Sequence, residues 1–235
     1  MEVEAVQPVA RPSRTRLYFW ILFVGVIAAV NYGARFSGGS SVNHKSTHDA
    51  VYSYTTFVGG TVLYAVWLGI VLLICIDRFD LLALRLPRTG WPKALGLAGA
   101  AVVGVFVVEG LVSLLPLPQS PGKEQGLTPT HWEPAHAGAF AANLVLFAVI
   151  APFVEELTFR GAGQSLLNTF VGRVPSILLI GLAFGLAHGL VEALLVLVPF
   201  GIALAVLRDR TDSTYPGMLV HGLFNGTALV LAVLS

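Results

Sequence analysis

The sequence predicts an all-α protein, a polytopic bundle of about seven transmembrane helices, with six to eight as the range. Hydrophobic residues make up 55% of the 235-residue chain and charged residues only 11%, whereas soluble domains carry about 25% charged residues. The mean hydropathy is +0.78. The apolar residues are gathered into runs long enough for a helix to cross a bilayer. We therefore expect one transmembrane domain over residues 1–235.

Seven apolar runs are the predicted spans. They cover approximately residues 17–34, 52–76, 94–115, 135–159, a run that begins near 175 and includes 188, and residues 191–207 and 215–234. The first run follows basic residues, as in a signal peptide, but it is longer than the usual 7–15 apolar residues of such a peptide. We expect it to be retained as the first span. Residues 161–173 are expected to form an amphipathic connector.

Two connections differ in composition from the others. Residues 35–50 are rich in glycine and serine and contain His44 and His48, whose spacing could suit a metal, although such a loop gives them no fixed geometry. Residues 116–134 contain five prolines, which exclude a regular helix. The sequence assigns no role to either loop.

The distribution of basic residues predicts the orientation. Lysine and arginine gather at the N-terminus, between the second and third spans, around residues 160–173 and at residues 208–210. The positive-inside rule then places residues 1–16 in the cytoplasm as an N-terminal tail. We expect an integral membrane protein, in the cell membrane if the source is prokaryotic.

The composition also bears on cofactors and partners. Cys75 is the only cysteine, so neither an intrachain disulfide nor a CxxC metal or haem motif can form. Basic clusters interleaved with aromatic residues are absent outside the membrane flanks, so no nucleic-acid partner is predicted. Membrane lipids are expected partners. The oligomeric state is not predicted.

The most informative stretch is residues 151–161, where two adjacent carboxylates and a guanidinium end an apolar run. In a helix, Glu156 and Arg160 are four residues apart and can pair. Glu155 is rotated by about 100° and faces elsewhere, which leaves its carboxylate available for chemistry. Alternatively, these charges mark a helix end at the headgroup level, where they reach water.

Other polar side chains lie within apolar runs. Phe184 and His188 share one predicted helical face, and so do His221 and Asn225. Burying any one of these polar side chains alone in a membrane costs free energy. That cost is lowest if the side chains meet Glu155 around water or an ion. Glu109 lies in the third run and is either a functional group or an interfacial one.

These residues form three motifs that resemble those of the CAAX protease and bacteriocin-processing (CPBP, or Abi) family of intramembrane endopeptidases. They are Glu155-Glu156-x-x-x-Arg160, Phe184-x-x-x-His188 and His221-x-x-x-Asn225. The resemblance covers roughly residues 140–235, the expected catalytic core, and no motif is matched in the first half. An HExxH motif is absent, which argues against a zincin-type protease.

The resemblance implies a role for each motif residue. Glu155 and His188 would activate the water that attacks the scissile carbonyl, and His221 with Asn225 would stabilise the oxyanion. Glu156, Arg160 and Phe184 would be supporting residues. A zinc site of Glu155, His188 and His221 remains an alternative. We favour no metal cofactor, because Asn225 is better explained as a hydrogen-bond donor.

The leading functional hypothesis is an endopeptidase that cleaves a membrane-associated or lipid-modified protein or peptide. One alternative is a catalytically silent membrane adaptor or bacteriocin-immunity protein. Another is a proton-coupled transporter, although no internal repeat of the kind common in transporters is visible. The sequence does not identify the substrate or show whether it is prenylated.

Overall fold

The computed structural model describes residues 11–37, 50–116, 129 and 131–234, and within these residues all regular structure is helical. This confirms the all-α prediction. The helices are α1 (Arg14–Ser37), α3 (Tyr54–Ile74), α4 (Trp91–Val112), α6 (Ala137–Val145), α7 (Ala151–Glu156), α8 (Gln164–Val171), α9 (Arg173–Ala187), α10 (Leu194–Thr211) and α11 (Tyr215–Leu234). His44, His48, the start of the N-terminal tail and most of the proline-rich loop lie outside the described residues.

Five helices are long and apolar enough to cross a membrane, counted among the described residues by length and composition. They are α1, α3, α4, the continuous helix Pro134–Val171 and α11. These helices support an integral membrane protein, but a count of about seven spans is not confirmed. Helix α9 has 15 residues, or about 22 Å, less than the roughly 30 Å of a bilayer core. Helix α10 carries three charged residues near its end, Arg208, Asp209 and Arg210.

The predicted end of the fourth span at about Phe159 is wrong, because the chain remains helical to Val171. Two π-helical segments, η3 (Leu146–Ile150) and η4 (Leu157–Gly163), join α6, α7 and α8 into one long helix. The first ends two residues before Pro152, whose ring nitrogen has no N–H to donate to the preceding turn. The helix ends at Gly172, whose φ of +84° favours glycine. The predicted connector is therefore the last part of this helix.

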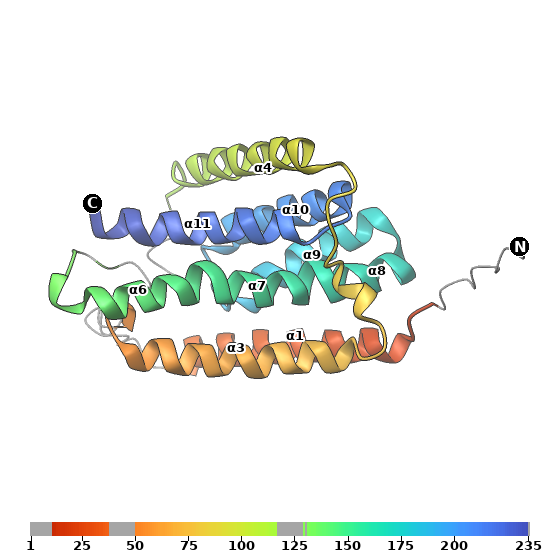
Figure 1. Ribbon diagram of the computed structural model, residues 1–235, viewed down its shortest axis with the longest axis horizontal. Helices are drawn as coiled ribbons and strands as arrows, with labels where there is room; N and C mark the ends of the chain where they lie inside the picture. The colour runs from red at the N-terminus through yellow and green to blue at the C-terminus, as the bar shows by residue number, and fades with distance from the viewer. Residues whose placement is uncertain (1–10, 38–49, 117–128, 130, 235) are drawn as a thin grey trace, which may run out of the picture.

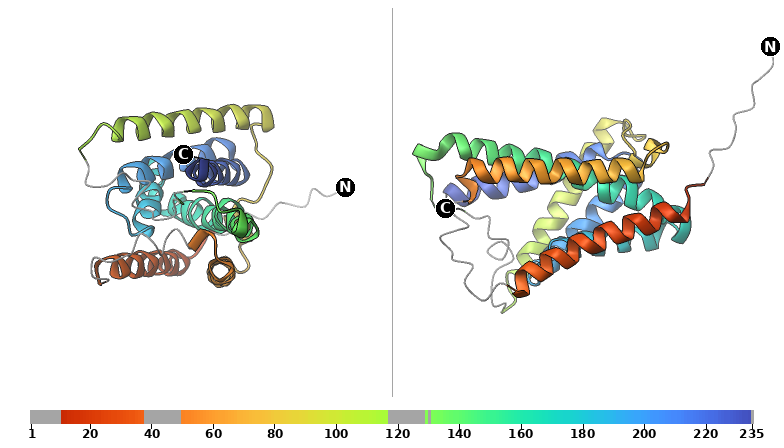
Figure 2. Two further views of the ribbon diagram at one scale, coloured as in Figure 1. Left: turned by 90° about the vertical axis from the view of Figure 1, so that its left-hand side faces the viewer. Right: turned by 90° about the horizontal axis from the view of Figure 1, so that it is seen from below.

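The long helix formed by α6, α7 and α8 lies in the middle of the bundle. Helices α1 and α3 lie on one side of it and α10 and α11 on the other, with α4 outermost (Figure 1). Figure 2 shows that α1 and α3 approach at one end and diverge toward the other. At the close end, Arg16 donates to the carbonyl oxygen of Ile74 over 2.6 Å.

Helix α1 is joined to the interior by specific hydrogen bonds. The Trp20 indole N–H donates to the carbonyl oxygen of Thr158 over 2.8 Å. Near the other end of α1, Asn31 Nδ2 donates to the carbonyl oxygen of Ala187 over 2.7 Å. The Tyr32 hydroxyl donates to the carbonyl oxygen of Leu190 over 3.0 Å. Helix α1 thus satisfies backbone groups at the C-terminal end of α9, where His188 lies.

Candidate active site

The centre of the molecule contains a fully buried ion pair. Arg160 Nη1 lies 2.7 Å from Glu156 Oε1, and both side chains have no exposed surface. The predicted pairing of these two residues is therefore confirmed, and the alternative that they reach water at a helix end is wrong. Arg160 Nη2 also donates to the carbonyl oxygen of Gly201 over 3.1 Å. The guanidinium carbon lies 4.3 Å from the centre of the Phe184 ring, a cation–π distance.

Glu155 faces a different direction from Glu156, as the helical offset predicts. Its Oε1 accepts a hydrogen bond of 2.7 Å from the Tyr64 hydroxyl. Its Oε2 is buried and has no hydrogen-bond partner among the described residues. That oxygen lies 4.0 Å from His188 Nε2 and 3.8 Å from His221 Nε2. One carboxylate oxygen is thus held by the protein and the other faces two imidazole rings.

His188 is the residue at which α9 ends. Its Nδ1 lies 2.8 Å from the carbonyl oxygen of Phe184, and because a carbonyl only accepts, Nδ1 carries the proton. The other nitrogen, Nε2, is the one that faces Glu155. Gly189 follows with a φ of +67°, which a residue with a side chain rarely adopts. The helix therefore stops inside the protein with His188 at its tip.

His221 on α11 is 2% exposed and lies between two aromatic rings. Its ring centre is 5.5 Å from that of Phe184 and 5.3 Å from that of Phe200. His221 Nδ1 lies 3.1 Å from Glu156 Oε1, the oxygen that also binds Arg160. Glu156 therefore orients His221, whose Nε2 faces Glu155.

Asn225 lies one turn further along α11. Its Nδ2 donates to the carbonyl oxygen of Phe147 over 3.1 Å. An amide nitrogen has two N–H groups, so this bond fixes the side chain and leaves one N–H for a ligand.

Glu155, His188, His221 and Asn225 line a single cavity of about 220 Å³. Tyr64 and Phe184 also contribute to its wall. Since a liquid water molecule takes up about 30 Å³, the cavity has room for several waters or a short piece of chain. The structure thus brings together the four residues for which the sequence predicts a catalytic role. Glu109 is exposed on α4 and does not line this cavity.

The residues considered for zinc do not form a compact ligand set. Ligands about 2.0–2.1 Å from a tetrahedral zinc ion lie about 3.3 Å from one another, which is shorter than the 3.8 and 4.0 Å that separate Glu155 from the two histidines. Within the described part of the chain, no group of three or more His, Cys, Asp or Glu residues has the geometry of a metal site.

The first half of the chain also contributes to the site, although no motif was recognised there. Besides Tyr64, α3 provides Trp67, whose indole N–H donates to Thr158 Oγ1 over 2.8 Å. Tyr64 and Trp67 are three residues apart in a mostly apolar helix. A buried Tyr or Trp usually has a partner for its polar group, so this spacing was a usable signal.

Residues 137–227 match a protein-family model described as type II CAAX prenyl endopeptidase Rce1-like. The matched segment contains all three motifs and confirms the predicted resemblance to the CAAX protease family. At a coarse level, it supports a membrane protease. No curated protein and no solved structure matches the chain.

The two glutamates differ in what they contribute to stability. Replacing Glu156 with Gln leaves the Arg160 charge buried without its paired carboxylate, which typically costs about 3–5 kcal/mol. We expect Glu156→Gln to lower the melting temperature in detergent strongly, as followed by circular dichroism. Glu155→Gln is the matched control and should melt near the wild type, because its amide can still accept from Tyr64. Equal melting temperatures for both variants would contradict the structural role of Glu156.

Proposed function

We propose that this chain, whose residues 137–227 match the CAAX protease family, is an intramembrane endopeptidase. It hydrolyses a peptide bond in a membrane-associated or lipid-modified protein or peptide. The observation that carries the proposal is the buried, unpartnered Oε2 of Glu155 facing two imidazole Nε2 atoms. A buried polar atom without a hydrogen-bond partner costs free energy. A water molecule at that position, the co-substrate of hydrolysis, would donate a hydrogen bond to Glu155 Oε2.

Glu155 and His188 are the proposed activators of that water. A water molecule can bridge Glu155 Oε2 and His188 Nε2 across their separation of 4.0 Å. As its oxygen attacks the scissile carbonyl carbon, the proton passes to Glu155. Collapse of the tetrahedral intermediate breaks the C–N bond, and the proton passes on to the leaving amine. The products are a carboxylic acid and an amine, with one water consumed.

Asn225 and His221 are the proposed oxyanion donors. Asn225 offers its remaining amide N–H. His221 is the second proposed donor, because Glu156 holds its Nδ1 while its Nε2 faces Glu155 across the cavity. Each fixed donor to an oxyanion is worth about 3–4 kcal/mol in a soluble protease.

Tyr64 is a proposed positioning residue. Its hydrogen bond to Glu155 Oε1 restricts the carboxylate to the rotamer that presents Oε2 to the histidines. It acts on the water only through Glu155.

The mechanism is metal-free, and the partners are membrane lipids and the substrate. The N-terminus is cytoplasmic, with the cavity reached from that side. No observation favours a proton-coupled transporter, whereas a silent adaptor or immunity protein is separated from an enzyme by the experiments below.

The central test is Glu155→Gln in purified protein reconstituted into vesicles, with a farnesylated CAAX peptide as the first substrate. We expect the wild type to cleave and the variant to lose at least about a thousandfold in rate, because glutamine cannot accept the proton. In parallel, mass spectrometry of membrane proteins from cells expressing each form should identify proteins left uncut by the variant. If the variant cleaves as the wild type does, or if the wild type cleaves nothing, the proposal fails.

Tyr64→Phe removes one hydroxyl next to the base. A hydrogen bond to a charged group contributes about 1.5–3 kcal/mol, so we expect kcat to fall about 10- to 100-fold while KM stays the same. Tyr54→Phe, on the exposed side of the same helix, is the control and should leave both constants unchanged. A rise in KM with kcat unaltered would show that Tyr64 binds substrate instead.

Metal independence can be tested directly. Because the candidate zinc ligands are spaced more widely than a zinc ion requires, incubation with EDTA or phenanthroline should leave the cleavage rate intact. Elemental analysis should find no stoichiometric zinc. Activity that is lost on chelation and restored by zinc alone would overturn the metal-free mechanism.

A further inference from the structure

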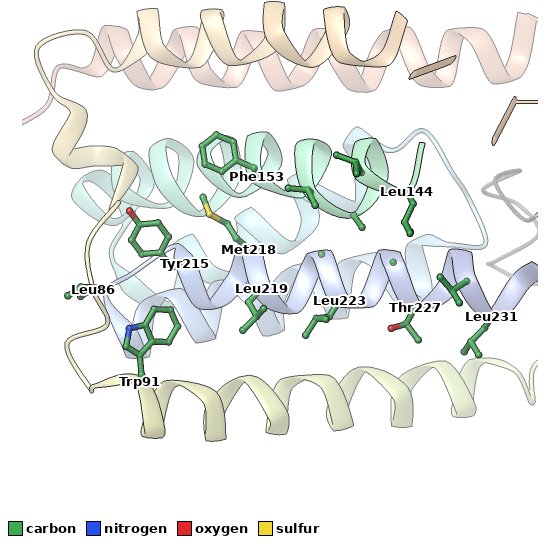
Figure 3. Close-up of a pocket in the computed structure, with 16 residues that line it drawn as sticks. Leu86, Trp91, Leu144, Phe153, Tyr215, Met218, Leu219, Leu223, Thr227 and Leu231 are labelled. Carbon is green, nitrogen blue, oxygen red and sulfur yellow. The ribbon is translucent and has the colours of Figure 1, made fainter. Parts of the chain in front are cut away.

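A second and larger cavity lies on the other side of α11 from the candidate active site. It has a volume of about 1110 Å³, slightly above the roughly 300–1,000 Å³ of typical ligand pockets. Its walls are α11 and the long helix, and the loop before α4 borders one end (Figure 3). The lining is almost entirely apolar and includes Leu144, Phe153, Leu219, Leu223 and Leu231. We call this cavity the outer groove.

The outer groove is separated from the catalytic cavity by close packing. A Cβ atom on Gly222 would lie 2.4 Å from the carbonyl oxygen of Ala148, so α11 touches the long helix there. His221 and Asn225 face the catalytic cavity, whereas Leu219 and Leu223 line the groove. The groove therefore offers apolar contact and none of the predicted catalytic groups.

One end of the groove has the composition of a membrane interface. Leu86, Trp91 and Tyr215 lie together at that end, and Leu231 lies at the other (Figure 3). Trp and Tyr are enriched at the headgroup level of bilayers. From Tyr215 to Leu231, α11 rises about 24 Å at 1.5 Å per residue, more than the roughly 15 Å of one leaflet's hydrocarbon. A lipid chain that starts at the aromatic end fits within the groove.

The same end carries an excess of positive charge. Asp212 lies 3.0 Å from Arg85, 3.6 Å from Arg88 and 3.1 Å from Arg208. One negatively charged carboxylate therefore pairs with three positively charged guanidinium groups. The Arg88 side chain is 78% exposed and the Arg85 side chain 50%. These two arginines flank Leu86 of the groove in sequence, so they can bind an anion at its mouth.

We propose that the outer groove binds one anionic phospholipid of the surrounding bilayer. The acyl chains lie along α11, the phosphate lies beside Arg85 and Arg88, and Trp91 and Tyr215 lie at the headgroup level. Basic clusters beside membrane helices select anionic lipids in this way, with about 1 kcal/mol for each basic residue. A zwitterionic lipid or a partner helix would leave the excess arginine charge unbalanced. A lipid group attached to the substrate is a poorer candidate, because α11 lies between the groove and Glu155.

The proposal is tested by lipid binding, which does not depend on peptidase activity. The full-length protein is incorporated into nanodiscs of phosphatidylcholine mixed with phosphatidylglycerol, and the lipids retained after transfer to detergent are counted by native mass spectrometry. We expect the wild type to retain one phosphatidylglycerol in preference to phosphatidylcholine. Arg88→Gln and Arg85→Gln should each reduce that preference about fivefold, from about 1 kcal/mol per basic residue.

Two further variants separate a defined site from general surface charge. Arg173→Gln removes an exposed arginine that is not part of the groove and should bind lipid as the wild type does. Thr227→Trp places a bulky ring inside the groove and should weaken retention of either lipid. The proposal is overturned if the wild type shows no preference, or if Arg173→Gln weakens binding as much as Arg88→Gln. Displacement of phosphatidylglycerol by a farnesylated peptide would assign the groove to substrate and also overturn it.

Discussion

The ion pair between Glu156 and Arg160 is the interaction on which the arrangement of the helices around the candidate active site depends. It lies fully buried, and its partners come from different parts of the chain: Gly201 on α10, His221 on α11 and the ring of Phe184 on α9. Buried ion pairs often add little net stability, because desolvation offsets their attraction. Here the pair has a geometric consequence, since it fixes three helices and the orientation of His221 at one point.

The sequence predicted the local relationships well. A spacing of four residues was sufficient to pair Glu156 with Arg160, and the cost of buried polar groups was sufficient to bring His188, His221 and Asn225 toward Glu155. Both arguments use only helical periodicity and solvation, which operate over short distances along the chain or are common to every membrane interior. The roles of these residues in catalysis stay predictions.

Features that arise from the packing of distant segments were missed. Hydropathy shows where a chain is apolar but does not distinguish a full span from a short helix such as α9. This helix ends at His188, where Gly189 adopts a positive φ and Asn31 of α1 donates a hydrogen bond to the carbonyl oxygen of Ala187. Periodicity does not reveal π segments, so the continuous helix through Gly161 was divided into a span and a separate connector. Tyr64 lies in an apolar run without a motif, and only the tertiary structure shows that it contacts Glu155.

The hydrogen bond from Asn31 to Ala187 joins residues 156 positions apart in the chain. The supports of His188 thus come from α1, while His221 and Asn225 lie on α11, the last helix described. During synthesis, α1 can make this contact only after α9 has been synthesised. A ribosome-bound chain that lacks α11 would have no complete set of these residues. The candidate active site is therefore complete only once α11 has joined the bundle.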